Sequence, residues 1–376
     1  MSCETLSASR PRIGIAGAGL LGRLLAWTLA RRGHAVSVFD PAPGPAPGFD
    51  GQGAAGFTAA GMLSPLAELE TAELDLAARG WDSLAHWEAL CDRWTQRRVL
   101  PPHFARRGSL MVAHRPDLGA AHRVLNRLAS LAQAAAWPQQ PQWLDTTALR
   151  DVEPGLHSSL GPLHAWMLPG EGQIDAVQAM QTLHADAPGV QWHWQAPVDT
   201  VKPGALGVKG DAKLHGFDWV FDTRGVGARP EVPVRGVRGE LVWLHAPGVG
   251  LQRPVRLLHP RHRVYIVPRP GDLVLVGASE LESEDRSPMS LRSAVELMAA
   301  AHSVLPALAE ARIVRLDTNL RPALPDNRPE IHTEAGLVRL NGLYRHGWLL
   351  APSLVHEALR RVQLISDTSS LIPTHA

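Results

Sequence analysis

The stretch RIGIAGAGLLGRLLAWTLARRGHAVSVFD, residues 12–40, decides the fold. It predicts a buried strand, a turn that matches G-x-G-x-x-G, a helix whose leucines share one face, and a second buried strand. Arg31, Arg32 and Gly33 follow the last apolar residue of the helix, where a helix stop is expected. This order is that of a dinucleotide-binding βαβ unit.

The glycines of the motif each have a physical task. Gly17 allows the tight turn, Gly19 lets the backbone approach a pyrophosphate, and Gly22 lets the helix pack closely on the strand. A diphosphate then lies on free N–H groups at the start of the helix, at Leu20 and Leu21, where the helix dipole is positive. The turn therefore predicts the phosphate end of a cofactor site.

The acid that ends the second strand completes the pattern. Asp40 lies 18 residues beyond Gly22 and is expected to accept hydrogen bonds from an adenosine ribose. The motif by itself does not separate NAD from FAD. A glycine-rich βαβ unit that binds nothing is the alternative, and the agreement of strand, helix, stop and acid favours dinucleotide binding over it.

Length and composition predict a soluble globular protein of one large or two ordinary domains. The chain has 376 residues, of which 45% are hydrophobic and 19% charged. A net charge of +1 with scattered basic residues argues against nucleic-acid binding and against an anionic membrane surface. The 18 histidines show no metal-ligand spacing, so we expect no metal site.

Cysteine usage predicts a reducing compartment. Cys3 and Cys91 are the two cysteines, which gives neither a disulfide framework nor a C-x-x-C site. The first twelve residues contain no apolar leader core, and no run of 18 apolar residues occurs. We therefore expect a cytoplasmic protein that does not span a membrane.

The rest of the chain predicts a strand-rich middle between two ends in which strands and helices alternate. Residues 41–56 are rich in proline and glycine and predict an irregular connection. Helices are expected at 71–94, 120–136, 176–185 and 291–303, and strands at 107–114, 190–201, 214–222 and within 234–278. The segment 340–365 predicts a strand, a glycine-containing loop and a helix. This order favours a nucleotide domain interrupted by a substrate domain.

Several further stretches resemble the D-amino-acid oxidase superfamily of flavoproteins, and within it the glycine oxidases of thiamin biosynthesis. The first two, AAGMLSP and TRGVGAR, resemble the loop beside the isoalloxazine ring and a second glycine turn at the cofactor. The others resemble the entry strand, the pocket-floor hairpin and the two segments that close over the flavin. In chain order, the six stretches are residues 59–65 (AAGMLSP), 223–229 (TRGVGAR), 234–240 (VRGVRGE), 265–279 (YIVPR with VGAS), 320–331 (LRPALPDNRPEI) and 344–352 (YRHGWLLAP).

The resemblance implies the cofactor and the architecture. It favours FAD over NAD, and it implies noncovalent FAD because no cysteine follows Cys91, where related sarcosine oxidases carry their flavin tether. The implied fold is α/β, with a Rossmann-like FAD-binding domain of the GR2 (D-amino-acid oxidase) type interrupted by an antiparallel-sheet α+β substrate domain. The expected ranges are 1–80, 150–230 and 317–376 for the first domain, and 81–149 and 231–316 for the second.

The resemblance also implies which further residues contact FAD. Those beside the ring, at the second turn and at the pyrimidine end of the flavin are Thr58, Ala59, Ala60, Gly61, Met62, Val198, Gly225, Gly347, Trp348, Leu349 and Leu350. In such a site the cofactor carries the redox chemistry, while the protein binds and orients.

Three residues are implied on the substrate side. Arg321 is expected to bind the substrate carboxylate through two parallel hydrogen bonds, the alternative being an ion pair with Asp317 or Asp326. Tyr265 is expected to hydrogen-bond the same carboxylate, the alternative being a packed strand residue. Arg345 is expected to close the site or contact flavin, the alternative being a surface position.

One residue departs from the pattern. Glu280 falls where some glycine oxidases have an apolar pocket residue. Facing the pocket, it would attract an ammonium group. Facing solvent, which is the expectation here, it would be an ordinary acid after a strand.

The activity implied is oxidation of glycine or a small amine or D-amino acid by O2. Hydride passes from the α-carbon to flavin N5, and the products are an imine or 2-oxo acid, ammonia and hydrogen peroxide, in thiamin thiazole synthesis. The alternatives are an FAD-dependent dehydrogenase with a quinone-type acceptor, an NAD-dependent dehydrogenase, and a noncatalytic FAD-binding protein. Family members are often tetramers, which leaves a homo-oligomer open.

Overall fold

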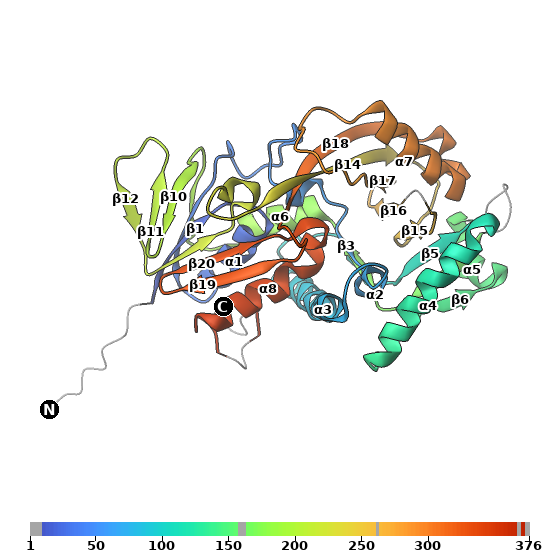
Figure 1. The fold of residues 1–376 in the computed structure, drawn as a ribbon, viewed down its shortest axis with the longest axis horizontal. Coiled ribbons are helices and arrows are strands. Elements are labelled where there is room, and N and C mark those ends of the chain that lie inside the picture. Colours follow the sequence, from blue (N-terminus) through green and yellow to red (C-terminus); the bar gives the residue numbers. More distant parts are fainter. Residues whose placement is uncertain (1–9, 157–162, 261–262, 367–369, 373–376) are drawn as a thin grey trace.

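The computed structural model describes residues 10–156, 163–260, 263–366 and 370–372 (Figure 1). Two large sheets dominate these parts of the chain, one of six strands and one of eight. Two three-stranded sheets accompany them. The chain passes repeatedly between the large sheets, so segments far apart in sequence meet where the sheets adjoin.

The six-stranded sheet carries the βαβ unit predicted from residues 12–40. Its order is β19-β20-β13-β1-β2-β9, and neighbours are parallel except for β19, which runs antiparallel at one edge. The strand order reverses on either side of β1, which is the position where such sheets bind ligands beyond their carboxyl ends. The strands are Arg12–Ala16 (β1), Ala35–Phe39 (β2), Gln191–His193 (β9), Trp219–Asp222 (β13), Glu330–Glu334 (β19) and Leu337–Asn341 (β20).

Helix α1, Leu20–Ala30, follows the glycine turn as predicted but is buried on every side. We expected one apolar face, whereas even Arg23 and Thr28 are buried. The reason is that α6 (Ala176–Ala185) and α8 (Gly347–Arg361) pack on α1 as well as the sheet does. The predicted stop is confirmed, because Gly33 has a positive φ of 80° just beyond the helix.

The eight-stranded sheet is the predicted strand-rich part. Its order is β18-β14-β17-β16-β15-β5-β7-β6, and all neighbours are antiparallel except β15 and β5. Its strands are Ser109–Ala113 (β5), Gln142–Leu144 (β6), His164–Leu168 (β7), Arg235–His245 (β14), Val255–Leu257 (β15), Val264–Arg269 (β16), Leu273–Gly277 (β17) and Arg312–Ala323 (β18).

Helices cover the second sheet and join it to the first. Helix α7 contacts β14, β16 and β17, whereas α3 packs on α8, and α2 packs on both α3 and α4. The bounds are Pro65–Glu68 (α2), Leu74–Gln96 (α3), Leu118–Ala134 (α4), Thr146–Val152 (α5) and Leu291–Val304 (α7). The expected cap is present, since the Asp175 carboxylate accepts a hydrogen bond from the N–H of Gln178 at the start of α6.

Two predicted strands are each divided between sheets. The run 190–201 becomes β9 and β10 (Val198–Lys202), because the chain turns before Pro197 and enters the small sheet β10-β11-β12. The run 214–222 becomes β12 (Leu214–Gly216) and β13 in the same way. The remaining strands are Met62–Leu63 (β3), Phe104–Ala105 (β4), Gly172–Ile174 (β8) and Ala205–Val208 (β11). Apolar patterning locates these segments but does not show where the chain changes sheet.

The sheets divide the chain differently from the expected domain ranges. Helix α3 crosses the boundary at 81 yet packs on α8, and its Trp87 and Trp94 belong to the core beneath the six-stranded sheet. Strand β7 lies within 150–230 but pairs in the eight-stranded sheet, and the boundary at 317 falls inside β18. Helix α3 therefore packs with the six-stranded sheet, and β7 and β18 belong to the eight-stranded sheet, while the division into two domains stays a prediction.

The described residues also bear on the expectations for membrane spans, metal sites and cysteines. Among the described residues, no helix is long and apolar enough to cross a membrane, and no group of three or more metal-ligating side chains occurs. Cys91 is buried and free, while Cys3 lies outside the described residues. Burial raises the pKa of the Cys91 thiol to about 12, so this thiol is not a reactive group.

The close packing of α1 on β1 predicts that Gly22→Ala destabilises the protein. A Cβ at this position would lie 1.8 Å from the Gly17 carbonyl oxygen. Alanine is favoured over glycine in a helix by about 1 kcal/mol. Overpacking costs about 1–3 kcal/mol or more, and the added Cβ would here clash with backbone, which cannot move aside easily. We expect a lower thermal midpoint and less bound FAD. Gly216→Ala, where a Cβ meets nothing within 4 Å, is the control, and equal midpoints for both variants would contradict the prediction.

Candidate functional site

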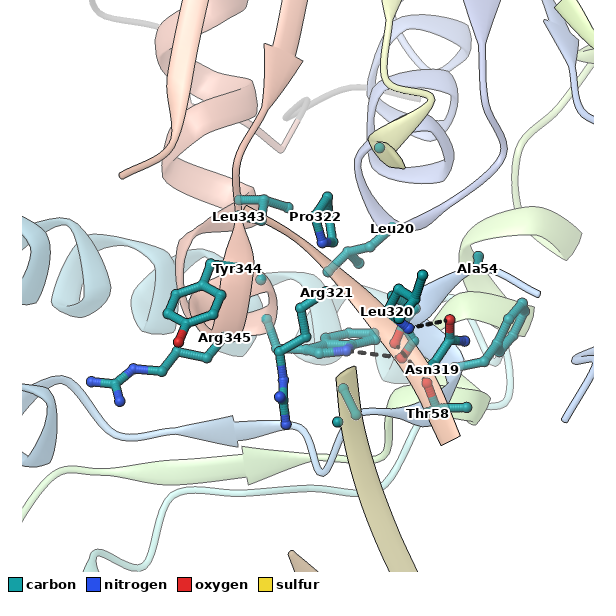
Figure 2. A pocket seen from close by; sticks show the side chains of 18 of the residues that line it. Leu20, Ala54, Thr58, Asn319, Leu320, Arg321, Pro322, Leu343, Tyr344 and Arg345 are labelled. Atoms are coloured by element: carbon teal, nitrogen blue, oxygen red, sulfur yellow. Dashed lines mark hydrogen bonds between the residues drawn. The ribbon is translucent and has the colours of Figure 1, made fainter. Parts of the chain in front are cut away.

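A cavity of about 1270 Å³ lies where the two large sheets adjoin, and Figure 2 shows part of its wall. Its walls come from the glycine turn, the loop 40–62, α2, β15, β16, β18 and the segment before α8. Sites for drug-sized ligands usually measure about 300–1,000 Å³. This cavity therefore has room for a large cofactor together with a small substrate.

One end of the cavity is the start of α1. Gly19 is the N-cap residue and forms no side-chain cap, so the first-turn N–H groups of Leu20 and Leu21 have no helical acceptor. Gly17 has a φ of 100°, and a Cβ there would lie 2.8 Å from the Thr223 carbonyl oxygen. Open N–H groups beside a turn that only glycine fits form a cradle for a diphosphate. These residues fit the phosphate end of FAD.

Gly22 has the packing task predicted for it. It does not line the cavity, and a Cβ at this position would meet the Gly17 carbonyl oxygen. Its contribution to the site is therefore the close approach that fixes the turn.

Asp40 lines the cavity, and its carboxylate also organises the glycine turn. One oxygen accepts a hydrogen bond from the N–H of Ala18 at 2.6 Å, and the other accepts from the N–H of Ala42 at 2.8 Å. A carboxylate has about four acceptor positions, so a ribose hydroxyl can still be bound. The ribose role stays a prediction.

Arg23, directly after the glycine motif, is a residue that sequence reasoning missed. Its guanidinium is buried and donates to the carbonyl oxygens of Ala18, Met180 and Pro45 at 2.8–3.0 Å. Burial lowers its pKa to about 10. It thereby ties the proline-rich connection 41–56 to α1, and an arginine inside an otherwise apolar helix was the available signal.

The predicted flavin loop lines the cavity at Thr58, Ala59, Ala60, Gly61 and Met62. Gly61 has a φ of 62°, and a Cβ there would lie 2.0 Å from the carbonyl oxygen of Ile174. The buried Arg269 fixes this loop by donating to the carbonyl oxygens of Ala60 and Ile174. The sequence placed Arg269 in the hairpin motif but did not reveal this contact.

Most of the remaining cofactor residues also line the cavity. Val198, Gly225, Gly347, Trp348 and Leu349 do so. Leu350 does not, because its side chain is fully buried in the core between α8 and the sheet. The contact expected of Leu350 is made by its backbone at the pyrimidine end of the flavin, so a buried side chain does not exclude it and it stays a prediction.

Arg321, on β18, extends into the cavity beside β14. Its Nη1 donates to the carbonyl oxygen of Ser279 at 3.0 Å, and a Cβ on Gly239 would lie 2.4 Å from its Cζ. The alternative ion pairs are absent from the described residues. Asp317 binds Arg315 at 2.7 Å, and Asp326 accepts from the backbone N–H of Arg328. Arg321 therefore presents a cation without a carboxylate partner in the described chain.

Tyr265 lines the same part of the cavity. It lies on β16, opposite Arg256 of β15 and Gly277 of β17 in the strand register. Burial raises the pKa of its hydroxyl, against the effect of the nearby Arg321. None of the described residues forms a hydrogen bond with the Tyr265 hydroxyl. It is both a packed strand residue and a donor available to a ligand.

Arg345 belongs to a buried charge cluster around Glu68 that sequence reasoning missed. A carboxylate oxygen of Glu68 lies 3.2 Å from Arg256 Nη2, and the other lies 3.2 Å from His346 Nδ1 and 3.4 Å from Arg345 Nη2. Burial raises the pKa of the Glu68 carboxyl, but His346, Arg256 and Arg345 outweigh it and hold that pKa far below its usual range. Arg345 therefore lies at the site as a paired cation, not on an open surface.

Glu280 lines the cavity and is also exposed to solvent, so the structure combines the two alternatives. The Tyr344 hydroxyl donates a hydrogen bond to its carboxylate, and Arg345 Nη1 lies 3.7 Å away. Its side chain is 45% exposed, so it occupies the rim of the cavity. Burial and the neighbouring Glu280 raise the pKa of Tyr344 to about 12. Figure 2 shows Arg321 and Tyr344 pointing the same way from the two segments that line this end.

Comparison with known proteins agrees with this geometry. A family model described as FAD dependent oxidoreductase matches residues 12–357. A protein of Rhizobium etli named as a thiamine biosynthesis oxidoreductase, ThiO, is 38% identical over 93% of this chain and 96% of its own length. The crystal structure of glycine oxidase from Geobacillus kaustophilus superposes with a TM-score of 0.79, at 25% identity and 98% coverage of both chains.

A more distant structure shows the fold alone. Iminodiacetate oxidase from Chelativorans sp. BNC1 superposes with a TM-score of 0.79 at 23% identity, covering 96% of this chain and 97% of that one. This likeness of fold does not identify the substrate of the present chain.

Glu171 lies behind the charge cluster and is fully buried. It accepts hydrogen bonds from the N–H of Ala67, at 2.8 Å, and from the Ser109 hydroxyl. Burial nevertheless raises its pKa to about 7, because Arg256 and these donors offset only part of the cost of burying the charge.

This pKa predicts how stability depends on pH. The pKa of Glu171 in the folded protein, about 7, is above the ordinary pKa of 4.5. The protonated carboxyl therefore contributes its full stabilisation of the folded state below about pH 4.5. This stabilisation is lost as the pH rises through about 7. Glu171→Gln removes the titrating group. We expect the thermal midpoint of the wild type to fall, relative to this variant, between about pH 5 and about pH 8. Glu310→Gln, at an exposed position, is the control, and parallel profiles for wild type and Glu171→Gln would contradict the prediction.

Proposed function

The chain belongs to the family of FAD-dependent oxidoreductases that includes D-amino-acid oxidase, and from this premise we propose that it oxidises glycine or a similarly small amino acid. The observation that carries the proposal is Arg321, a cation in the cavity wall with no carboxylate partner in the described chain. A planar guanidinium binds a carboxylate through two parallel hydrogen bonds. The hydroxyl of Tyr265 is a second donor at the same place.

The cavity fits FAD at the glycine turn, the loop 58–62 and the start of α8. Bound FAD supplies the acceptor for the hydride that leaves the substrate α-carbon. The residues of this chain bind the substrate carboxylate, orient the α-carbon and exclude water. Such positioning contributes much of the rate acceleration, because the reacting atoms are already held in the geometry that the reaction needs.

The relatives support a place in thiamine biosynthesis. The Rhizobium etli protein carries that description, and a second relative, from Geobacillus kaustophilus, is named glycine oxidase and is 26% identical over 90% of this chain. We propose that the imine formed from glycine serves thiazole synthesis, that O2 is the electron acceptor, and that the enzyme works in the cytoplasm. The buried free thiol of Cys91 is compatible with a reducing compartment. A homo-oligomer is proposed by analogy with the family alone.

The proposal is tested with the purified protein. We expect it to be yellow, to release FAD on denaturation, and to form hydrogen peroxide and ammonia when glycine is added in air. A colourless protein without FAD would contradict it. Glycine-dependent reduction of a dye without peroxide would instead favour a dehydrogenase that uses a quinone-type acceptor.

Arg321→Ala is expected to weaken substrate binding. The loss of a buried charged partner costs about 2–5 kcal/mol, so kcat/KM for glycine falls by about thirtyfold or more. The measurement is oxygen consumption across glycine concentrations, with FAD content and thermal midpoint recorded in parallel. Arg312→Ala, on the same strand with an exposed side chain, is the control. An unchanged kcat/KM in Arg321→Ala would remove this residue from the site.

A further inference from the structure

The cavity places an anionic side chain directly beside the proposed carboxylate site. Arg321 donates to the carbonyl oxygen of Ser279, and Glu280 is the next residue along the chain. Both residues line the cavity, yet Arg321 forms no ion pair in the described part of the protein. The Arg321 guanidinium is thus bound to the residue that precedes Glu280, and no ion pair joins the two side chains in the described chain.

Glu280 is held in place from both sides. The Ser279 hydroxyl donates to Glu240 at 2.8 Å, and the Leu281 N–H donates to the carbonyl oxygen of Arg238 at 3.0 Å. The Tyr344 hydroxyl then orients the carboxylate from the opposite wall. The position of the charge is therefore set by the backbone of the eight-stranded sheet and by the segment before α8.

The Glu280 carboxylate keeps capacity for a ligand. A carboxylate offers about four acceptor positions, and in the described chain the partners of Glu280 are one hydroxyl and one guanidinium 3.7 Å away. Arg345 is itself shared with Glu68, so its charge is divided between two acids. Unused acceptor positions on a partly buried anion are suited to an ammonium group.

We propose that Glu280 binds the amine nitrogen of the substrate and so selects amino acids over hydroxy acids. An α-amino acid carries its ammonium group one carbon from its carboxylate, so its site needs an anion and a cation in one cavity. Glu280 and Arg321 line the same cavity, and Arg321 is bound to the residue before Glu280. The inference rests on the proposed amino-acid oxidase function and adds a second charged contact to it. It also disfavours quaternary ammonium groups, which have no N–H to donate.

The test compares two ligands of nearly equal size. Glycine has both the carboxylate and the ammonium group, whereas glycolate has the carboxylate and a neutral hydroxyl. Binding of glycolate to the FAD-loaded enzyme is followed by the flavin absorbance. Binding of glycine is obtained from the concentration dependence of flavin reduction without oxygen, or by the same titration if no reduction occurs.

Glu280→Gln removes the charge with little change in shape. A hydrogen bond to a charged group contributes about 1.5–3 kcal/mol, so we expect the Kd of glycine to rise about tenfold or more. The Kd of glycolate is expected to stay unchanged or to fall. Glu282→Gln, two residues away and paired with Arg235 outside the cavity, is the matched control and is expected to change neither Kd.

The outcomes are distinct. Equal weakening of glycine and glycolate in Glu280→Gln would show that the residue acts only by holding Tyr344 and Arg345, and would overturn the inference. An unchanged glycine Kd would overturn it as well. Failure of the wild type to oxidise glycine contradicts the proposed function, while the ratio of the two Kd values still decides the role of Glu280.

Discussion

The approach of α1 to β1 is the constraint on which the rest of the structure depends. Gly22 packs on the carbonyl of Gly17, and Gly17 in turn lies against Thr223 at the end of β13. The Thr223 hydroxyl donates to the carbonyl oxygens of Ala16 and Gly17 at 3.0 Å. Because these contacts fix the turn, the start of α1 faces the cavity. The other walls of the cavity surround this helix end.

The cavity is shaped by contacts that span long stretches of chain. Trp348, in α8, donates to the carbonyl oxygen of Gly56, and Asn319, in β18, donates to that of Gly53. The guanidinium of Arg315 lies between the rings of Phe49 and Trp243, 3.6 and 4.3 Å from their centroids. The proline-rich connection is thereby fastened to the eight-stranded sheet and to helix α8. Its irregular backbone is ordered by these partners and not by secondary structure of its own.

Charge distribution decides which groups remain for the substrate. Glu68 is surrounded by Arg256, Arg345 and His346, so these side chains are largely occupied by one buried acid. Arg321 and Glu280 both line the cavity, and no ion pair between them occurs in the described chain. Arg321 binds the Ser279 carbonyl, and Glu280 accepts a hydrogen bond from Tyr344. Glu280 is exposed at the rim and Arg321 is half-buried, so both charges are accessible to a ligand that enters the cavity.

The sequence by itself determined the βαβ unit, the glycine turn, the cap at Asp175 and, through six motifs, the family and its cofactor. These features depend on residues close together in the chain, where spacing translates directly into geometry. The tertiary structure decided that α1 is buried on all sides, that Leu350 turns into the core, and that Glu280 meets Tyr344, 64 residues away, at the cavity rim. Such contacts arise from packing between distant segments, so no local pattern records them.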